Sequence, residues 1–447
     1  MSELFLIFPD LLNLSSLKTG KTLFLPPSNM PSKRFYKNFL RYLVFPIGFA
    51  IGITLAIVWS AGKIQESPRF IQRHTFPVDS IFIDLDKPIM AKKGKIIDSI
   101  FSNLAAKGGF NGTILYAEKG RLVFKKAYGY DDFKGKKKLT TRSAFQLASV
   151  SKMFTSMSIM ILKEEGLLNF DDSVRKYIPE LPYPGLTIRE LLNHRSGLQD
   201  YMHFSDHYWD QTRPLTNEDM IRIMIDDQIP RAFSPGNGFD YCNTNYALLA
   251  SVVERITKKP FDEFVRENIF DPLDMDDAFI YRLKRGDSIP EYIPVGVCGH
   301  RGGRGLPRVE PNFYQNGVVG DKGVYASVED LFKWDQALYS DILVSQATLE
   351  EAFKEGSPRF REWRDNYGFG WRLKAERPKT VYHYGWWKGF RTYFIRDIYQ
   401  EKSIIVLTNW TRSLSSGLLY EILDDRRYEL GPVCPYTAVT SKKSKRK

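Results

Sequence analysis

The stretch "AFQLASVSKMFTSM", residues 144–157, places a serine and a lysine three positions apart at the start of an apolar, methionine-rich segment. Residues three apart on a helix share one face, so Ser149 and Lys152 are expected to be neighbours. A serine hydroxyl is a weak nucleophile and needs a nearby base. At the amino end of a buried helix, the macrodipole and desolvation both favour a neutral, basic lysine. The stretch therefore suits nucleophilic catalysis; the alternative is a helix N-cap serine followed by a surface lysine.

The flanking segments predict both strands and helices. Residues 112–130, "GTILYAEKGRLVFKKAYGY", alternate in polarity and break at residues 118–120, which predicts an antiparallel hairpin. Three later segments are rich in β-branched and aromatic residues and predict strands: 380–387, 391–397 and 403–410. Apolar residues at helical spacing predict helices at 93–108, 188–192, 245–256, 261–269, 328–338 and 418–423. We expect an α+β fold, in which the hairpin and the late strands form one antiparallel sheet flanked by helices, with a mostly helical insert.

The net charge of +12 lies mainly at the two ends of the chain. Residues 1–63 carry seven basic and two acidic side chains, and residues 442–447 carry five basic ones. Residues 64–441 are left with a net charge of only +2, so the folded part lacks the basic bias of a nucleic-acid-binding protein. The basic tail is expected to be solvated and disordered.

One uncharged segment near the start predicts membrane insertion. Residues 42–61, "YLVFPIGFAIGITLAIVWSA", have the length of a helix that crosses a ~30 Å hydrocarbon core. Basic residues crowd its amino side, so residues 1–41 are expected in the cytoplasm and the rest of the chain outside it. We expect a transmembrane helix or signal anchor, and a cleaved signal peptide is the alternative.

Residues 145–180, "FQLASVSKMFTSMSIMILKEEGLLNFDDSVRKYIPE", resemble the S-x-x-K region of serine β-lactamases and penicillin-binding proteins. The resemblance is close to class C β-lactamases and to the DD-peptidases and esterases that share their fold. It continues in the family's order over about residues 95–425, through "LTIRELLNHRSGLQDY" (186–201), "FSPGNGFDYCNTNYALLASVVERIT" (233–257), "GDKGVYASVEDLFKWDQAL" (320–338) and "VYHYGWWKGF" (381–390). It implies a β-lactamase/transpeptidase-like fold.

The resemblance also implies roles for particular residues. Tyr241 and Asn243 match the family's Y-x-N motif, so Tyr241 is expected to share proton transfer with Lys152, and Asn243 to hold the substrate's amide group. The N–H groups of Ser149 and Trp386 are expected to form the oxyanion hole.

The third family motif departs from the class C pattern. His383, Tyr384 and Gly385 stand where class C β-lactamases carry Lys-Thr-Gly and many DD-peptidase and esterase relatives carry His-x-Gly. A side chain at Gly385 is expected to block a substrate backbone at the strand edge. A neutral His383 supplies less positive potential than lysine, which disfavours β-lactam hydrolysis. Arg391 or Lys388 is the candidate to restore that charge, and a solvated side chain is the alternative for each.

The sequence therefore predicts an extracytoplasmic serine hydrolase that works through an acyl-enzyme at Ser149. Its partners would be a D-Ala-D-Ala-type peptide or small ester as substrate and a membrane through the N-terminal helix, with no metal or organic cofactor implied. Two alternatives stay open: a non-catalytic relative that binds a wall peptide or a partner, and a class C-like β-lactamase. The expected divisions are 1–41 (cytoplasmic), 42–61 (transmembrane), 62–94 (linker), 95–428 (hydrolase domain) and 429–447 (basic tail).

Overall fold

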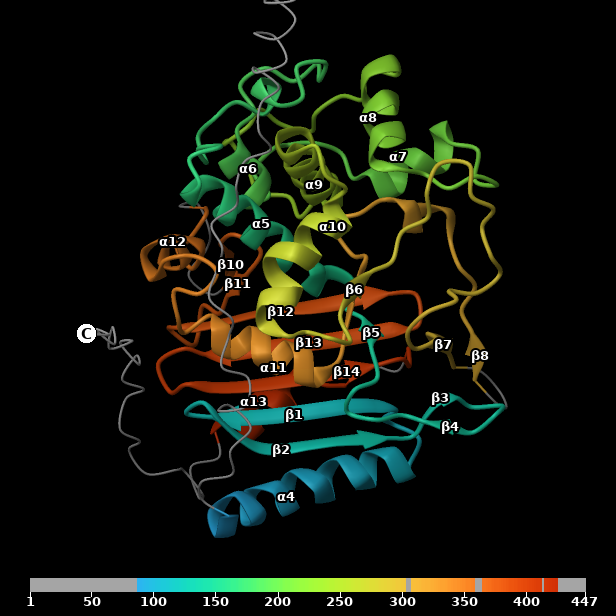
Figure 1. The fold of residues 1–447 in the computed structure, drawn as a ribbon, viewed down its shortest axis with the longest axis vertical. Coiled ribbons are helices and arrows are strands. Elements are labelled where there is room, and N and C mark those ends of the chain that lie inside the picture. The colour runs from blue at the N-terminus through green and yellow to red at the C-terminus, as the bar shows by residue number, and fades with distance from the viewer. Residues whose placement is uncertain (1–86, 303–306, 358–363, 412–413, 425–447) are drawn as a thin grey trace, which may run out of the picture. The chain divides into compact units, whose positions relative to one another are not determined.

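The computed structural model describes residues 87–302, 307–357, 364–411 and 414–424 (Figure 1). Within them, a seven-stranded antiparallel sheet has the order β10-β11-β12-β13-β14-β1-β2. Its strands are β1 (Gly112–Glu118), β2 (Arg121–Tyr128), β10 (Asn366–Tyr367), β11 (Arg372–Leu373), β12 (Thr380–Trp387), β13 (Phe390–Asp397) and β14 (Lys402–Thr408). The predicted sheet, built from the first hairpin and the late strands, is confirmed, but β10 and β11 are two further strands that the sequence did not predict.

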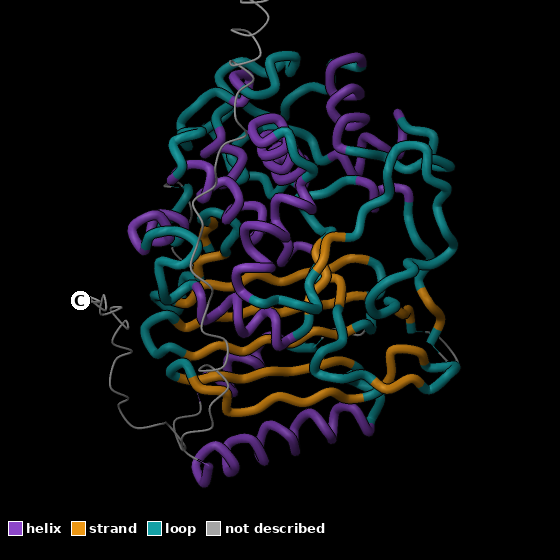
Figure 2. The backbone as a smooth tube through the Cα atoms, viewed as in Figure 1, coloured by secondary structure: helices purple, strands orange, loops and turns teal. Residues whose placement is uncertain are grey.

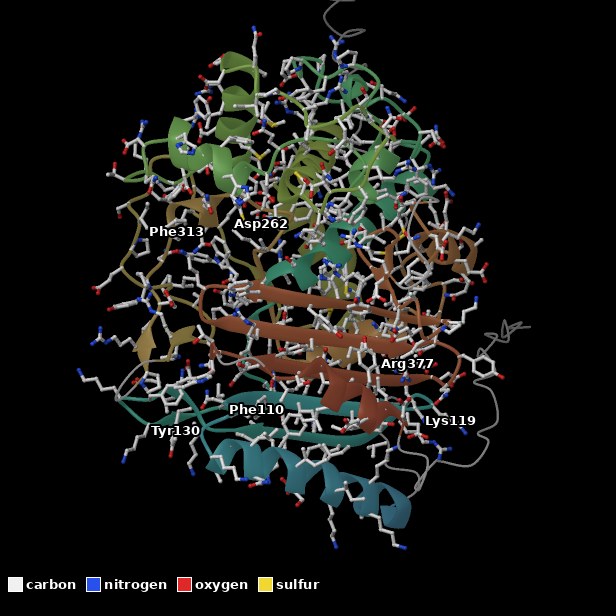
Figure 3. All side chains as sticks on the ribbon, turned by 180° about the vertical axis from the view of Figure 1, so that it is seen from behind. Phe110, Lys119, Tyr130, Asp262, Phe313 and Arg377 are labelled. Atoms are coloured by element: carbon white, nitrogen blue, oxygen red, sulfur yellow. The ribbon has the colours of Figure 1, made fainter. Side chains whose placement is uncertain are left out.

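The first hairpin closes through a two-residue turn. Lys119 and Gly120 both have positive φ, 52° and 70°, as a type I′ turn requires. The mirror-image turn matches the twist of the two strands, so β1 and β2 pair directly. Lys119 lies at the end of the sheet in Figure 3. Because β1 also pairs with β14, chain segments almost 300 residues apart become neighbours, for example Gly112 and Thr408.

The two faces of the sheet are covered differently. Helices α4 (Lys87–Ala106) and α13 (Ser416–Asp424) cover one face, where Ile97, Phe101 and Leu419 pack against Ile114 and Ile404. The opposite face supports a helical region, most of which lies above the upper strands in Figure 1 and whose helices are purple in Figure 2. Its helices are α5 (Lys152–Glu164), α6 (Ile188–Leu192), α7 (Tyr201–Tyr208), α8 (Asn217–Asp226), α9 (Asn243–Thr257), α10 (Phe261–Val265), α11 (Val328–Ala337) and α12 (Gln346–Ala352).

Helix caps explain several helix starts that the apolar pattern alone leaves uncertain. Thr216 and Asp219 form a capping box that begins α8, and Ser327 and Asp330 form one that begins α11. The sequence did not predict α7, α8 or α12. The short strands β3 (Tyr130–Asp132), β4 (Lys137–Lys138), β5 (Phe145–Gln146), β6 (Phe279–Ile280), β7 (His300–Arg301), β8 (Arg308–Val309) and β9 (Val324–Ala326) were also missed. Segments of two or three residues carry too little alternation to be recognised.

The expected fold class needs one correction. It included an N-terminal transmembrane helix at residues 42–61, and these residues lie outside the described ranges. Among the described residues, no helix is both long and apolar enough to cross a bilayer. For the described residues, the fold class is therefore corrected to the α+β sheet-and-helix domain alone.

Candidate active site

Ser149 stands at the junction between a short strand and a buried helix. The chain leaves β5, passes through Ala148 at a φ of +49°, and enters a 3₁₀ turn (η5, Ala148–Ser151) that continues into α5. A positive φ is uncommon for alanine, so the surrounding contacts must hold this turn. Leu147 supplies two of them: its N–H donates to the Val324 carbonyl at 2.8 Å, and its carbonyl accepts from Thr392 Oγ1 at 2.7 Å.

Gly385 lets strand β12 lie directly against this turn. A Cβ atom at Gly385 would clash with the Leu147 carbonyl oxygen and the Thr392 hydroxyl. The expected reason for this glycine was room for substrate. The structure gives a different one: the space that a side chain would need is filled by the segment leading into Ser149.

Lys152 is completely buried, and its amine contacts three oxygen atoms. Nζ lies 3.2 Å from Ser149 Oγ, 2.8 Å from Asn243 Oδ1 and 3.0 Å from the Asp321 backbone carbonyl. Its exposed fraction is 0%, whereas Ser149 is half-buried. Ser149 and Lys152 are thus neighbours as expected, with Ser149 partly exposed and the Lys152 amine enclosed.

Tyr241 lies beside Lys152 without bonding to it. The Lys152 amine is 5.0 Å from the centre of the Tyr241 ring, and the Tyr241 hydroxyl has no hydrogen-bond partner among the described residues. The Arg372 guanidinium lies over the same ring, with Cζ 5.1 Å from its centre. A phenol with a free hydroxyl beside a buried lysine can exchange a proton with a bound substrate.

Both ends of the Asn243 amide are already occupied. Its oxygen accepts from Lys152, and its nitrogen donates to Asp200 Oδ2 at 2.8 Å and contacts the Met202 sulfur at 3.5 Å. Asp200 also accepts from the Asn243 backbone N–H at 2.9 Å and caps helix α7. In this structure Asn243 therefore orients Lys152, and it has to exchange a partner before it can hold a substrate amide.

His383 faces the site but is held neutral. Burial, then the charges of Arg372 and Lys152, lower the pKa of His383 well below its usual value. Its Nδ1 contacts the Tyr384 carbonyl at 2.8 Å, and a carbonyl only accepts, so we assign the ring proton to Nδ1. Nε2 then accepts from the Tyr367 hydroxyl at 2.9 Å. Both ring nitrogens are used within the protein, and the residue supplies no positive charge.

Neighbouring β12 residues alternate between the two faces of the sheet. Trp386 pairs in register with Arg391, and both lie on the face opposite Gly385. Arg391 stacks on Trp386, with Cζ 4.1 Å from the ring centre, and Trp386 is 70% exposed. The side chains of Trp386 and Arg391 are therefore not brought to Ser149. Of Trp386, only the backbone N–H remains a candidate for the oxyanion hole.

Trp387 lies on the site face instead. Its indole N–H donates to Asn316 Oδ1 at 3.1 Å, and its ring helps to line a small pocket with Gln146, Lys388 and Phe390. Lys388, the other candidate to restore positive charge, lies over the Phe313 ring at 3.5 Å.

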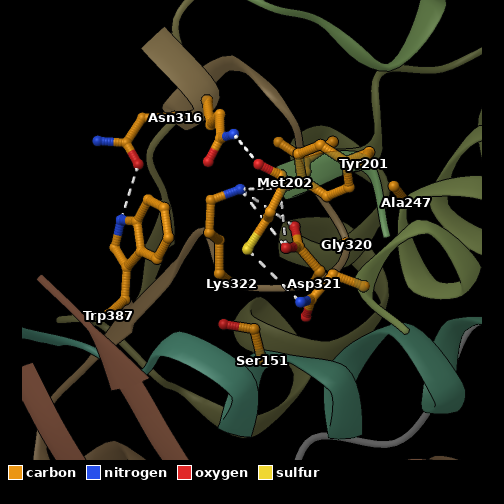
Figure 4. Close-up of polar contacts among 12 residues, drawn as sticks. Ser151, Tyr201, Met202, Ala247, Asn316, Gly320, Asp321, Lys322 and Trp387 are labelled. Atoms are coloured by element: carbon orange, nitrogen blue, oxygen red, sulfur yellow. Dashed lines mark hydrogen bonds and ion pairs between the residues drawn. The ribbon is translucent and has the colours of Figure 1, made fainter. Parts of the chain in front are cut away.

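Sequence reasoning missed two cations and one acid. Lys322 and Asp321 are buried beside Lys152, and Figure 4 shows the Lys322 side chain between Trp387 and Asp321. Arg372 enters from β11. The quoted segment 320–338 contains Asp321 and Lys322, but lysine is usually a surface residue, so nothing local identifies a buried one.

Comparisons with known proteins identify the family of this chain. The family model described as "Beta-lactamase" matches residues 97–424. The chain is 37% identical over 325 residues to "Penicillin-binding protein 4*" of Bacillus subtilis (strain 168), which covers 71% of this chain and 72% of that protein.

Solved structures are also similar in fold. A penicillin-binding protein from Bacillus halodurans has a TM-score of 0.61 at 23% identity, covering 72% of this chain and 96% of that one. A D-amino acid amidase from Ochrobactrum anthropi SV3 has a TM-score of 0.59 at 22% identity, covering 71% and 91%. At such identities these two likenesses concern the fold alone. The family model and the 37% identical relative carry the conclusion: this chain belongs to the beta-lactamase family of serine hydrolases.

Proposed function

We propose that this protein hydrolyses an amide or ester through an acyl-enzyme at Ser149. The observation that carries the proposal is the 3.2 Å contact between the hydroxyl of the half-buried Ser149 and the amine of the completely buried Lys152. A serine paired with a buried amine has a base at hand for its proton.

The reaction has two stages, acylation of Ser149 and hydrolysis of the acyl-enzyme. The Ser149 oxygen attacks the substrate carbonyl carbon while a neutral Lys152 takes the hydroxyl proton. The N–H groups of Ser149 and Trp386 stabilise the negative charge on the carbonyl oxygen. The C–N or C–O bond then breaks, and the leaving group departs with the proton held by Lys152. Water attacks the resulting ester, loses its proton through the same amine, and releases the acid and free Ser149.

Tyr241 and Asn243 have supporting roles in this scheme. The Tyr241 hydroxyl has no hydrogen-bond partner among the described residues, so it is open to a bound substrate or water, through which it relays the proton from Lys152 to the leaving group. Asn243 and the Asp321 carbonyl hold the Lys152 amine in place.

The substrate class that we favour is a peptide with a free carboxylate, of the D-Ala-D-Ala type. Arg372 supports this choice, because its guanidinium stacks on Tyr241 and forms no ion pair with a carboxylate of the described residues. A guanidinium recognises a carboxylate with two parallel hydrogen bonds. The 37% identical relative is named as a penicillin-binding protein, and we propose by analogy that this protein also acts outside the cytoplasm. Efficient β-lactam turnover is disfavoured, because His383 is neutral.

Intact-mass spectrometry of the full chain tests the proposal. The protein is incubated with a fluorophosphonate and, separately, with a fluorescent penicillin, beside Ser149→Ala as the matched control. We expect one adduct per chain with each reagent and none in the control. A lasting penicillin adduct favours the DD-peptidase type, and a fluorophosphonate adduct alone favours the esterase type. The absence of an adduct with either reagent would contradict the enzymatic function and favour the binding-protein alternative.

A further inference from the structure

A second lysine lies buried in the same site as Lys152. Lys322 is 2% exposed and Asp321 is 0% exposed. The Lys322 amine donates to the Tyr201 hydroxyl and lies 3.4 and 3.5 Å from the two Asp321 carboxylate oxygens. The Tyr201 hydroxyl in turn donates to Asp321 Oδ2 at 2.9 Å. The rings of Tyr201 and Trp387 enclose the amine, at 5.0 and 5.3 Å from their centres.

Asp321 joins the two lysines through different atoms. Its carboxylate pairs with Lys322, while its backbone carbonyl accepts from Lys152 Nζ at 3.0 Å. The segment is fixed to the nucleophile turn on its other side, since Val324 N donates to Ser151 Oγ at 3.1 Å and Leu147 N donates to the Val324 carbonyl at 2.8 Å. Any shift of Asp321 therefore moves a hydrogen-bond acceptor of the Lys152 amine.

The two amines also interact electrostatically. Burial lowers the pKa of Lys322, Asp321 opposes that change, and the charge of Lys152 lowers it further. An isolated charge is costly to bury, so each charge in this cluster depends on its neighbours. The titratable and charged groups around the two amines are Asp321 on the same loop, Asp200 and Tyr201 of α7, Tyr241 and Tyr246 at α9, His194 after α6, Arg372 of β11 and His383 of β12.

We propose that Lys322 is a positioning residue for the reaction. It neutralises the Asp321 carboxylate, so that Asp321 presents to Lys152 only its backbone carbonyl. The Asp321–Lys322 pair thereby sets the pH range in which Lys152 accepts the Ser149 proton. This inference rests on the proposed function, because it concerns the proton transfer that activates Ser149.

The two single substitutions have opposite expected effects. Lys322→Met leaves an unpaired carboxylate near Lys152, which favours the charged amine and moves the alkaline onset of serine reactivity to higher pH. Asp321→Asn leaves an unpaired ammonium there and moves the onset to lower pH. An unpaired charge inside a buried cluster shifts the titration of a neighbouring group by about 1 unit or more, so Lys322→Met is expected to react about tenfold more slowly near neutral pH. The double variant, with neither charge, is expected to regain most of that loss.

The measurement is the second-order rate of fluorophosphonate labelling of the full chain against pH. The reagent forms an O–P bond to Ser149 and releases fluoride, and it carries no carboxylate. Arg396→Met is the matched control, because the Arg396–Asp335 pair is equally buried, with a 2.6 Å contact. Arg396 lies near the carboxyl end of β13, whereas Thr392, which contacts the segment leading into Ser149, lies near the start of the strand. The pH midpoint of Arg396→Met is expected to equal that of the wild type. Circular dichroism verifies folding, and if Lys322→Met does not fold, the isosteric Asp321→Asn and the charge-keeping Lys322→Arg carry the test.

Several results would overturn the inference. One is that the midpoints of folded Lys322→Met and Asp321→Asn stay at the wild-type value or move in the same direction. If Lys322→Met does not fold, the inference fails when the pH midpoint of Asp321→Asn does not move to lower pH. It also fails when the pH midpoint of Lys322→Arg differs from that of the wild type. Another contradicting result is slower labelling of Lys322→Met by penicillin but not by fluorophosphonate, which identifies Lys322 as a carboxylate ligand. An unreactive wild type contradicts the proposed function instead, so the two failures are distinguishable.

Discussion

The two faces of strand β12 have different tasks, although they belong to one family motif. His383, Gly385 and Trp387 face Ser149 and the helical region. Tyr384 and Trp386 face the other way, where the Tyr384 hydroxyl lies 3.0 Å from the Tyr420 hydroxyl of α13. The middle residue of the His-x-Gly motif therefore serves packing, while its two outer residues define the site. Substitutions on the two faces are expected to separate activity from stability.

The largest effect is expected at Gly385. Gly385→Ala pushes a Cβ against the Leu147 carbonyl and the Thr392 hydroxyl, so β12 and the Ser149 turn have to move apart. A displacement of about 1 Å at reacting groups costs about 100-fold in rate, which is the expected loss of fluorophosphonate labelling. Trp386→Ala, on the other face, is the control and is expected to keep its rate within about twofold. Equal losses in both variants would refute the division between the faces.

Two arginines provide the next comparison. Arg372 reaches the Tyr241 ring, whereas Arg391 stacks on Trp386 on the far face. Hydrogen bonds to charged groups contribute about 1.5–3 kcal/mol, so Arg372→Ala is expected to slow penicillin acylation about tenfold or more. Arg391→Ala is expected to leave the rate unchanged. If penicillin acylation is slowed in neither variant, or only in Arg391→Ala, the assignment of Arg372 as the carboxylate ligand is contradicted.

The pH dependence of stability tests the neutral state of His383. Burial is the largest cause that lowers the pKa values of both His194 and His383 well below the ordinary value. In the unfolded chain each imidazole binds a proton below about pH 6.5, so the unfolded state takes up protons that the folded state excludes. The free energy of unfolding is therefore expected to fall as the pH decreases from 7 to 5. The slope below pH 6 reaches at most about 1.4 kcal/mol per pH unit for each histidine.

Urea titrations at several pH values measure this slope. His383→Gln removes one of the histidines whose pKa is lowered, which also include His194 and His300, so its slope is expected to be smaller than that of the wild type by about one histidine's share. An unchanged slope means that His383 is protonated in the folded protein, and that a positive charge is available at the third motif after all.

The smallest effect is expected at Tyr384. Tyr384→Phe removes its hydrogen bond to Tyr420 but leaves the ring packed against Tyr382 and Tyr393. A typical hydrogen bond contributes about 0.5–1.5 kcal/mol to stability, so the free energy of unfolding falls by about that much. Labelling of Ser149 is expected to stay within twofold. A large loss of labelling places the Tyr384 hydroxyl in the site and contradicts its assignment to the packing face.

Local pattern was sufficient for the parts of the fold whose signals are continuous. The hairpin 112–128, the late strands and helix 188–192 follow from alternation, turn residues and helical spacing. The placement of Ser149 next to Lys152 follows from helical geometry, and family resemblance located Tyr241, Asn243 and His383 near them. The expectation for Arg391 did not take strand alternation into account, which assigns Arg391 and its partner Trp386 to the face opposite Gly385.

The remaining site residues depend on contacts that no local pattern encodes. Lys322 and Arg372 belong to residue types that are mostly exposed, so the burial of Lys322 and the position of Arg372 over Tyr241 become visible only when α7, β11 and β12 are brought together. The reason for Gly385 likewise depends on Leu147, which lies more than 200 residues earlier in the chain.

Peptide mapping of the labelled site tests the central claim most directly. The full chain is labelled with fluorophosphonate and digested, and the adduct is located by mass spectrometry in the wild type and in Lys152→Met. We predict a single adduct on Ser149 in the wild type and its loss in folded Lys152→Met, because the buried amine that contacts the hydroxyl is gone. An adduct on another residue, or undiminished labelling of Ser149 without Lys152, would contradict the account.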